Sequence, residues 1–512
     1  MGGGPRVLPR ARAGKGRGAR ASGAGVRAPS WAWAPGRGHG CPGACAEIWG
    51  SGASERARRG EYRPDAVRLT PRKGSVMRRT RTGESSSDSE RVRPGPGQEL
   101  WSAPARPRAL HGREPVRPSR TGAHGVDRDV PEAVRRVLQE VLRERVRECA
   151  ALDDTFAQDV AGRVADFTLN GGKRLRAQFL WWALRACGGG SRQAEADTAL
   201  RLAAGLELIQ TCALVHDDVM DGSAVRRGRP ALHVALAARY AGSGATGPGE
   251  PFGRSAAVLA GDLALSWADD VVAEAWDAAA VTGDVRQRVR GLWRAMRTEM
   301  VAGQYLDLHG QVTGSRAVST AIRTATLKSA LYSVERPLAL GAALAGADDR
   351  TTSALCCAGR CAGIAFQLRD DLLGVFGDPR TTGKPSGDDI RDGKLTYLTA
   401  VARARAEAGG DRAVTALLDT SLGDASLSDE GLARVREALV ETGARDLVEA
   451  KIERLVAVGH RHLASVPLAP RGETRLRALL NSVAAVSVPA PVHVGRTVDG
   501  PRPAEICEER AR

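Results

Sequence analysis

Aromatic side chains are scarce in this sequence, at 4% of 512 residues, and so is lysine, with 7 of the 75 basic residues. No transmembrane segment is expected, because the longest uncharged stretch, 478–495, is interrupted by Asn481, Pro489 and Pro491. The nine cysteines are odd in number and scattered, which argues against a disulfide framework and offers no paired spacing for a metal. These absences favour a reducing, cytoplasmic location.

The excess of positive charge is confined to the N-terminus. The formal net charge is +16, but residues 1–130 hold 26 basic and 11 acidic side chains, and the rest is nearly balanced, with 49 and 48. The first 128 residues are rich in Arg, Gly and Pro without apolar periodicity, which predicts a disordered tail. Either translation starts downstream, at Met77 for example, or the tail is a real extension that touches RNA or anionic lipid. No nucleic-acid partner is expected for the folded domain.

From Val130 onward, apolar residues recur at spacings of three and four, the period of an amphipathic helix. In residues 131–152, for example, valines and leucines form one stripe while arginines and glutamates fill the other face. Similar stripes follow, and strand-like alternation is almost absent. The sequence therefore predicts a basic tail (1–128), one all-α domain (129–487) and a loose, Pro-rich C-terminal tail (488–512).

Two acidic clusters close apolar helices. The first is Asp217-Asp218-x-x-Asp221, whose first and last carboxylates lie one turn apart on one helix face. The second is Asp370-Asp371. Carboxylates are hard ligands that suit Mg²⁺, which usually also keeps waters and takes substrate phosphates. A single such pair is more often a solvated helix end, but two in one domain favour a metal site.

Lysines are so rare here that their positions are informative. The domain has five of them: Lys173, Lys328, Lys384, Lys394 and Lys451. Three lie at glycine-rich turns, Lys328 lies within a helix, and only Lys451 is expected to be an ordinary surface residue. A compact ammonium reaches a phosphate as a point charge. Together with Arg226-Arg227 beside the first acidic cluster, these cations favour Mg²⁺-diphosphate chemistry over nucleic-acid binding.

Six motifs, taken in order, resemble those of the trans-isoprenyl diphosphate synthases, also called polyprenyl synthetases, and in particular geranylgeranyl diphosphate synthases. They are Gly-Gly-Lys-Arg-x-Arg at 171–176, Asp-Asp-x-x-Asp at 217–221 with Arg226-Arg227-Gly228, Gly303-Gln304-x-x-Asp307, Lys328-Ser329, Phe366-Gln367-x-x-Asp370-Asp371, and Gly383-Lys384-Pro385. The resemblance covers roughly residues 130–487. It implies an all-α, isoprenoid synthase-type bundle around a deep central cavity, with the two aspartate motifs facing each other at its mouth, usually in a homodimer.

The resemblance also implies a reaction. An allylic diphosphate ionises, and the double bond of isopentenyl diphosphate attacks the resulting carbocation. Cleavage of the C–O bond leaves extra negative charge on diphosphate, which Mg²⁺ held by Asp217, Asp221 and Asp370 would stabilise as a Lewis acid. Asp218 and Asp371 are expected to hold waters or to orient these ligands. No protein nucleophile is needed, and released diphosphate takes the final proton.

Family positions assign the remaining polar residues to two diphosphate sites. The allylic diphosphate is expected to bind Arg226, Lys328, Ser329, Gln367, Lys384 and Lys394. Isopentenyl diphosphate is expected to bind Lys173, Arg176, Gln210 and Arg227. The residues expected to act in catalysis itself are Asp217, Asp221, Asp370, Lys328 and Arg226.

The chain departs from the family pattern at two positions. Gly374 stands where the second motif usually has a fifth-position aspartate, and Asp378 follows one turn later, where the helix is expected to stop. This weakens one metal contact without removing Asp370. Ala177 replaces a common proline, which should change only the stiffness of the loop. The residues expected merely to pack helices, and so left out of the site, are Gly303, Gln304 and Asp307.

Product length is expected to depend on side chains below the first aspartate motif. One helical turn rises about 5.4 Å, close to one isoprene unit, so Ala213, Cys212 and Ile209 would act as successive floors. In this family an aromatic side chain at the first two positions stops growth early, and both are small here. Geranylgeranyl diphosphate is therefore the expected product, with a longer polyprenyl diphosphate as the alternative if Ile209 does not block. A Cys212→Phe variant is expected to shorten the product.

The sequence argues against three other functions. A class I terpene cyclase would need a second metal motif of Asn, Ser and Glu, which is not found in the sequence. A non-catalytic subunit of a heteromeric prenyl synthase would be expected to lose aspartates or site lysines, which this chain keeps. A nucleic-acid-binding function would rest on the N-terminal tail alone.

Overall fold

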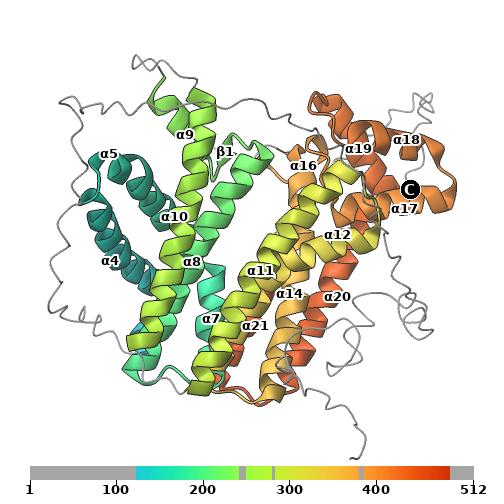
Figure 1. Ribbon diagram of the computed structural model, residues 1–512. Coiled ribbons are helices and arrows are strands. Elements are labelled where there is room, and N and C mark those ends of the chain that lie inside the picture. Colours follow the sequence, from blue (N-terminus) through green and yellow to red (C-terminus); the bar gives the residue numbers. More distant parts are fainter. Residues whose placement is uncertain (1–122, 242–248, 279–282, 380–385, 485–512) are drawn as a thin grey trace, which may run out of the picture.

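The computed structural model describes residues 123–241, 249–278, 283–379 and 386–484, and most of them form helices (Figure 1). In chain order the α-helices are α3 (Ala123–Val126), α4 (Val130–Ala150), α5 (Asp154–Phe156), α6 (Gly162–Leu169), α7 (Leu175–Ala186), α8 (Gln193–Asp221), α9 (Leu232–Arg239), α10 (Gly249–Ala278), α11 (Gly283–Thr313), α12 (Val318–Ala325), α13 (Arg336–Leu344), α14 (Asp349–Phe376), α16 (Asp388–Arg391), α17 (Tyr397–Gly409), α18 (Arg412–Ser421), α19 (Asp429–Glu441), α20 (Ala444–Ala464) and α21 (Pro470–Ala484). Two π-helices are η1 (Ala157–Ala161) and η2 (Thr326–Glu335). The all-α prediction is confirmed.

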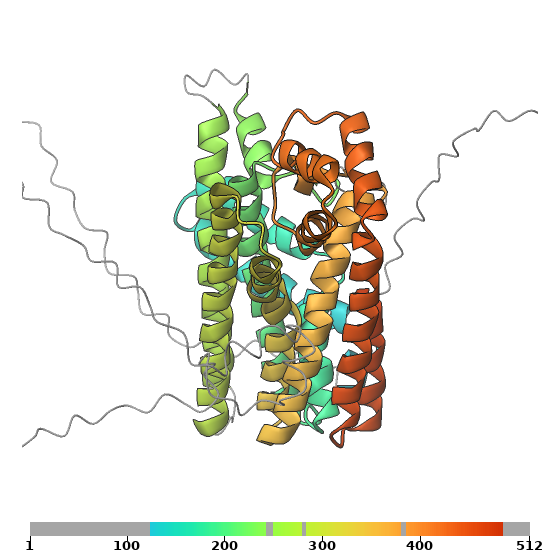
Figure 2. The ribbon, with the colours of Figure 1, turned by 90° about the vertical axis from the view of Figure 1, so that its right-hand side faces the viewer.

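The only strands in the described residues are β1 (Val225–Arg226) and β2 (Arg229–Pro230), which pair antiparallel as a hairpin. This hairpin and α16 lie at the same end of the long helices, whereas α17, α18 and α19 form a smaller group beside that end (Figure 1). Seen at right angles, the long helices stand side by side along a common axis (Figure 2). Loops from different parts of the chain therefore meet at one end of the bundle.

Helix α8 is the centre of the first half of the bundle, because it is apolar around most of its circumference and must be covered on several sides. It packs against α10, α7 and α4. Gly205 allows a close approach to α10, since a Cβ there would lie 2.6 Å from the Val272 side chain. By length and composition alone, Gln193–Met220 could cross a membrane, but 78% of its apolar window is buried inside the domain, as in a core helix.

The second half of the bundle is organised around η2, which lies between α11 and α14. Two glycines bring these helices close. A Cβ on Gly303 of α11 would collide with the backbone of Lys328, and a Cβ on Gly363 of α14 would lie 2.6 Å from the Ala330 Cα. π-helical turns are rare and often occur at functional sites. Here the π-helix carries Lys328 and Ser329.

The folded domain begins earlier than the sequence indicated. Residues 123–128 were assigned to the disordered tail, but α3 and the turn after it pack on the domain. Asp127 is only 1% exposed and accepts hydrogen bonds from Trp181 Nε1 at 2.9 Å and Arg185 Nε at 3.2 Å. A buried carboxylate needs such partners. The rest of the predicted N-terminal tail, residues 1–122, and residues 485–512 lie outside the described residues.

The expectation for Lys451 was wrong. Lys451 is 7% exposed, and its ammonium lies 5.4 Å from the ring centroid of Tyr397. Its position on α20 next to charged residues gave no sign of burial. The six cysteines of the described residues form no disulfide with one another. Cys41, Cys45 and Cys507 lie outside the described residues.

Candidate active site

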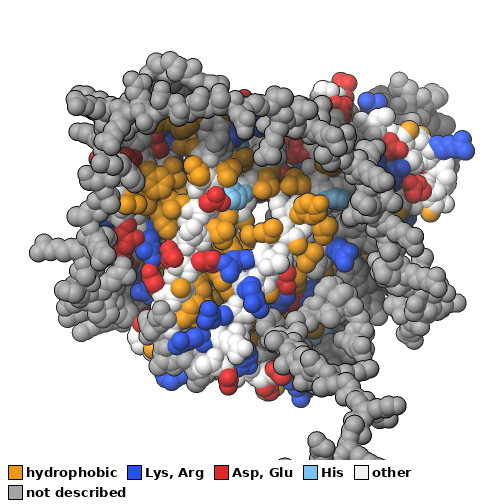
Figure 3. Space-filling view, viewed as in Figure 1, with side chains coloured by type: hydrophobic (Ala, Val, Ile, Leu, Met, Phe, Trp, Pro, Cys, Tyr) orange, Lys and Arg blue, Asp and Glu red, His pale blue; other side chains and the backbone are white. Residues whose placement is uncertain are grey.

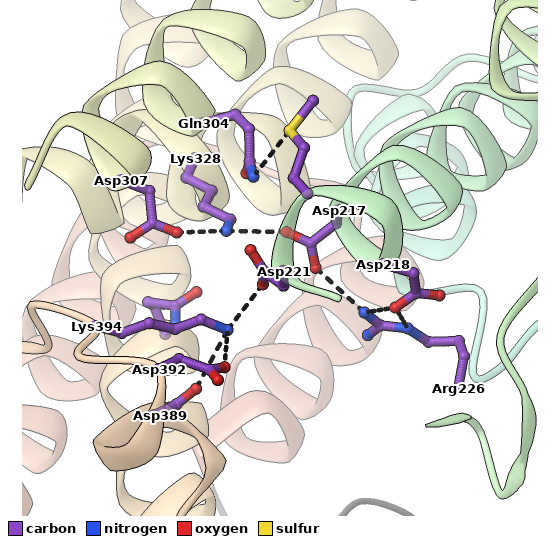
Figure 4. Close-up of polar contacts among 12 residues, drawn as sticks. Asp217, Asp218, Asp221, Arg226, Gln304, Asp307, Lys328, Asp389, Asp392 and Lys394 are labelled. Atoms are coloured by element: carbon purple, nitrogen blue, oxygen red, sulfur yellow. Dashed lines mark hydrogen bonds and ion pairs between the residues drawn. The ribbon is translucent and has the colours of Figure 1, made fainter. Parts of the chain in front are cut away.

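The first aspartate motif closes α8 at the end of the bundle where the loops meet. The helix stops because Gly222 adopts a left-handed conformation, with φ of 66°. Asp217 and Asp221 lie on the side that faces Lys328 and Lys394, whereas Asp218 turns away from it (Figure 4). Two of the three carboxylates therefore point toward a shared space.

Asp218 is fully buried and holds the hairpin. Arg226 of β1 donates from Nε to Asp218 Oδ1 at 2.7 Å, and its Nη2 contacts both Asp218 and Asp217. Burial opposes the charge on Arg226, but the two carboxylates outweigh burial and raise its pKa. Asp218 thus holds the Arg226 guanidinium next to Asp217, and its predicted part in metal binding stays a prediction.

Lys328 joins α8 to α11. Its Nζ lies 3.1 Å from Asp217 Oδ1 and 2.7 Å from Asp307 Oδ2. Burial disfavours the charge on Lys328, but these carboxylates outweigh it and raise the lysine pKa. Burial also opposes ionisation of Asp217, but Lys328 and Arg226 hold the pKa of that carboxyl below its ordinary value.

Leaving Asp307 and Gln304 out of the site was therefore wrong. Asp307 binds Lys328 directly, and Gln304 Nε2 lies 3.6 Å from the Met220 sulfur, within the first motif (Figure 4). The motif Gly303-Gln304-x-x-Asp307 contained the signal, since Asp307 lies one helical turn after Gly303, which contacts the Lys328 backbone. On this turn of α11, Gly303 packs against the Lys328 backbone and Asp307 binds the Lys328 ammonium.

Lys394 joins the first motif to the loop around α16. Its Nζ lies 2.9 Å from Asp221 Oδ2, 3.5 Å from Asp389 Oδ1 and 3.6 Å from Asp392 Oδ2. Burial opposes its charge, but the surrounding carboxylates raise the pKa of Lys394. Sequence reasoning missed Asp389 and Asp392, although the acidic run beside Lys394 marked them.

The second aspartate motif lies on α14. Asp370 is exposed, whereas Asp371 is buried and accepts a hydrogen bond from Gln367 Nε2 at 2.8 Å. Burial raises the pKa of Asp371 to about 8, assisted by the nearby charges of Asp389 and Asp370. Gln367, assigned to the allylic diphosphate, thus also orients Asp371.

The missing aspartate at Gly374 has a counterpart in space. A Cβ on Gly374 would collide with the Asp389 carboxylate. This carboxylate therefore occupies the space next to Gly374 where an aspartate side chain at that position would begin. Asp378, the substitute suggested by the sequence, follows Gly377, where α14 has already ended. Asp389 therefore restores a third carboxylate beside the second motif.

A second basic group surrounds Tyr332 of η2. The Arg176 guanidinium lies 4.3 Å from the centroid of the Tyr332 ring and donates to Ser333 Oγ at 2.7 Å. Tyr332 Oη donates to Gln210 Oε1 at 2.7 Å. Two residues predicted for isopentenyl diphosphate thus share one buried tyrosine. Sequence reasoning missed Tyr332, because only the fold brings it between α7 and α8.

The other residues predicted for isopentenyl diphosphate lie in nearby loops. Lys173 is exposed, and Arg227 donates to the carbonyl oxygens of Phe167 at 3.3 Å and Asn170 at 3.2 Å. Arg174, next to Lys173, has a φ of 48° and forms a buried pair with Glu207 at 3.0 Å. The basic loop is therefore anchored by Arg174, which leaves Lys173 free of that structural task. Lys384 lies outside the described residues.

The three residues predicted to control product length differ in orientation. Ala213 is half-buried on the α8 face that carries Asp217. Cys212 is 3% exposed, and its sulfur lies 3.7 Å from His216 Nδ1, whose Nε2 lies 3.0 Å from the Val258 carbonyl oxygen of α10. Cys212 thus faces α10, whereas Ile209 is fully buried.

The carboxylates suit a hard cation that arrives with its substrate. Among the described residues, no three His, Cys, Asp or Glu side chains are close enough to hold a metal unaided. Mg²⁺ rarely needs such a cage, because it binds through one or two carboxylates together with waters and substrate phosphates. Asp217, Asp221 and the exposed Asp370 are therefore a fitting donor set, and Lys328 and Lys394 balance charge beside them.

The sequence matches the polyprenyl synthetase family over residues 158–429, more than half of the chain. Among curated relatives, it is 32% identical over 299 residues to the geranylfarnesyl diphosphate synthase of Aeropyrum pernix, covering 58% of this chain and 84% of that protein. It is 31% identical over 314 residues to the (2E,6E)-farnesyl diphosphate synthase of Mycobacterium tuberculosis, covering 61% and 79%.

The fold is similar to solved structures of the same kind. A geranylgeranyl pyrophosphate synthase from Corynebacterium glutamicum, crystallised with isoprenyl diphosphate and magnesium, superposes with a TM-score of 0.65 at 39% identity. The match covers 69% of this chain and 98% of that protein. The chain therefore belongs to the polyprenyl synthetase family and is a trans-prenyltransferase.

Proposed function

We propose that this enzyme condenses isopentenyl diphosphate with an allylic diphosphate and that geranylgeranyl diphosphate is its main product. The observation that carries the proposal is the network at the mouth of the bundle. It joins Asp217 to Lys328 and Asp221 to Lys394, and Lys394 also pairs with Asp389, whose carboxylate lies against Gly374 of the second motif. Cations and carboxylates alternate there, which suits a metal-bound diphosphate.

The proposed metal is Mg²⁺, held by Asp217, Asp221 and Asp370. When bound, it would act as a Lewis acid on the diphosphate oxygens. The similar Corynebacterium enzyme was crystallised with magnesium, which supports this choice. Asp389 lies beside the second motif, where it can orient waters on the Asp370 side.

The chain's own cations would assist ionisation of the allylic substrate. As the C–O bond breaks, its electron pair goes to diphosphate, and positive charge develops on the allylic carbon. Lys328, Lys394 and Arg226 already lie beside the carboxylates and would turn toward diphosphate oxygens, where negative charge increases. Such preorganised charge is effective because the site needs little reorganisation during the reaction.

The isopentenyl diphosphate would bind around Tyr332, held by Arg176, Lys173 and Arg227. Its double bond then attacks the carbocation, a new C–C bond forms, and the released diphosphate removes one proton to restore a double bond. Tyr332 fixes Arg176 by ring stacking and Gln210 by a hydrogen bond. Both groups are thereby oriented before the substrate arrives.

The product assignment depends on the small side chain at Ala213. This residue lies on the face below Asp217, where a larger side chain would stop growth after one or two additions. The named relatives make products of several lengths, so a longer polyprenyl diphosphate remains the alternative.

The proposal includes a homodimer in the cytoplasm. Figure 3 shows a broad apolar area over α10, and the exposed apolar residues of this helix include Phe252, Val258 and Leu259. A contiguous apolar surface of this kind is typical of a protein interface. The cysteines of the described residues form no disulfide with one another, which supports the choice of a reducing compartment.

The test is a primer panel. The full chain is incubated with Mg²⁺, isopentenyl diphosphate and, separately, dimethylallyl, geranyl or farnesyl diphosphate, and products are identified by mass spectrometry. A 20-carbon diphosphate is expected from each primer. If folded protein gives no elongated product with any primer, the non-catalytic subunit of a heteromeric synthase replaces this proposal.

A further inference from the structure

Glu207 is a buried carboxylate of α8 that has no part in the reaction proposed above. It is 7% exposed and precedes Gln210 by three residues, so the two side chains lie on the same side of the helix. A buried carboxylate is costly unless it is paired. Its partner is Arg174, whose Nη1 lies 3.0 Å from Glu207 Oε2. This ion pair therefore connects α8 with the loop that precedes α7.

Arg174 extends this connection to the end of α6. Its Nη2 donates to the carbonyl oxygens of Thr168 at 3.1 Å and Leu169 at 3.0 Å. The last carbonyl groups of a helix have no partners within it, so a guanidinium there satisfies them, and the helix dipole stabilises its positive charge. Gly171 leaves room for this guanidinium, because a Cβ there would lie only 3.3 Å from Arg174 Nη1.

Arg227, in the turn between β1 and β2, holds the same segment. It donates to the carbonyl oxygens of Phe167 and Asn170, and its guanidinium lies 5.1 Å from the centroid of the Phe167 ring. Within the described ranges, Arg174 and Arg227 are the only non-glycine residues with a positive φ, at 48° and 55°. Such a conformation is unfavourable for a residue with a Cβ and often occurs at functional sites. Two arginines held in this way bind four successive carbonyl groups, those of residues 167–170.

These contacts connect Glu207 with the residues that the proposal assigns to isopentenyl diphosphate. Lys173 and Arg176 lie on either side of Arg174 in the sequence. Burial raises the pKa of Glu207, and the positive charges of three arginines oppose this rise: Arg174, Arg176 and Arg227. One carboxylate thus balances a group of guanidinium ions. Without it, these cations would repel one another, and Arg174 would lose the partner that fixes its position.

We infer that Glu207 is a positioning residue for isopentenyl diphosphate: through Arg174, it holds the loop 171–176 in the geometry that binds this substrate. The inference rests on the proposed function, because it concerns how one substrate of that reaction is held. The allylic diphosphate is assigned to Lys328 and Lys394, which are oriented by aspartates instead. Loss of the Glu207 carboxylate should therefore affect the two substrates unequally.

The test measures steady-state kinetics of a Glu207→Gln variant of the full chain with Mg²⁺, isopentenyl diphosphate and farnesyl diphosphate. Glutamine keeps the size of the side chain and removes its charge. The KM for isopentenyl diphosphate should rise about 10- to 100-fold, because a small displacement of a binding group has effects of this order. The KM for farnesyl diphosphate should be unchanged, and kcat should change much less than the first KM.

Asp127→Asn is the matched control. Asp127 is a buried carboxylate, 1% exposed, that pairs with Arg185 near the other end of α7. The change again converts a buried carboxylate to an amide, so it reports the effect of a general loss of stability. Both KM values should stay at the wild-type level.

If Glu207→Gln does not fold, Glu207→Leu combined with Arg174→Met replaces the ion pair with apolar side chains of similar volume, which buried pairs often tolerate. It should raise the same KM. An unchanged KM for isopentenyl diphosphate in a folded variant overturns the inference, as does an equal rise in both KM values. A lower KM also overturns it, because the carboxylate would then only weaken the positive field. A wild-type enzyme that makes no elongated product would instead refute the proposed function.

Discussion

Replacing Gly303 with alanine should push α11 away from η2. This would shift the backbone of Lys328, which lies on η2 against Gly303. The added Cβ would collide with the Lys328 backbone, which cannot rotate away as a side chain could. Overpacking of this kind costs about 1 to 3 kcal/mol. Because Lys328 binds both Asp217 and Asp307, a shift of its backbone also weakens the contacts that orient its ammonium.

Gly310→Ala on the same helix provides the control. The nearest atom to a Cβ on Gly310 is Leu395 Cβ at 4.0 Å, an ordinary contact. Alanine there should stabilise the helix by about 0.5 to 1 kcal/mol, since glycine is the poorer helix former. Alanine has the same propensity advantage over glycine at both positions, so the two variants should differ by about 1 to 3 kcal/mol in the free energy of unfolding, which is the cost of overpacking at Gly303.

Thermal and denaturant unfolding of the two variants measure this difference, and the KM for the allylic diphosphate reports on Lys328. We expect Gly303→Ala to be less stable and to bind the allylic substrate more weakly, whereas Gly310→Ala keeps the wild-type KM. Equal stabilities of the two variants would refute the reasoning. A destabilised Gly303→Ala with an unchanged KM would show that packing at Gly303 does not position Lys328.

Three further predictions concern separate parts of the chain. Asp389→Asn should raise the Mg²⁺ concentration for half-maximal rate by about 10-fold or more, as measured by titrating metal, because it removes the carboxylate that compensates for the missing aspartate. Ala213→Phe should shorten the product by filling the face below the first motif, as mass spectrometry would report, and an unchanged product would contradict that placement. Asp127→Ala should lower the free energy of unfolding by about 3 to 5 kcal/mol, because it strands Trp181 and Arg185 without their buried acceptor.

Helix periodicity and motif order were sufficient to predict the all-α fold and both aspartate clusters. A three- and four-residue spacing is a local property, and so is a carboxylate pair at a helix end. The short hairpin β1–β2 escaped prediction because two-residue strands leave no alternating pattern. Residues 123–128 escaped it because their attachment depends on Trp181 and Arg185, more than 50 residues away.

Some residues of the site were missed for the same reason, because their contacts join distant parts of the chain. Asp389 matters because its carboxylate meets Gly374, and Tyr332 matters because it lies between Arg176 and Gln210. Both relations require the folded chain, since they join helices that are far apart in sequence. Asp307 could more easily have been predicted, because the sequence shows its motif and only its partner, Lys328, was unknown.

The most direct test of the central claim compares incorporation of labelled isopentenyl diphosphate by the wild type and by Asp221→Asn, with farnesyl diphosphate and Mg²⁺. Asp419→Asn is the control, since this carboxylate binds Arg316 and Arg403 away from the aspartate motifs. We expect a labelled 20-carbon diphosphate from the wild type and from the control, and a loss of about 100-fold or more in rate for Asp221→Asn. Equal rates for all three proteins would contradict the assignment of the reaction to this site.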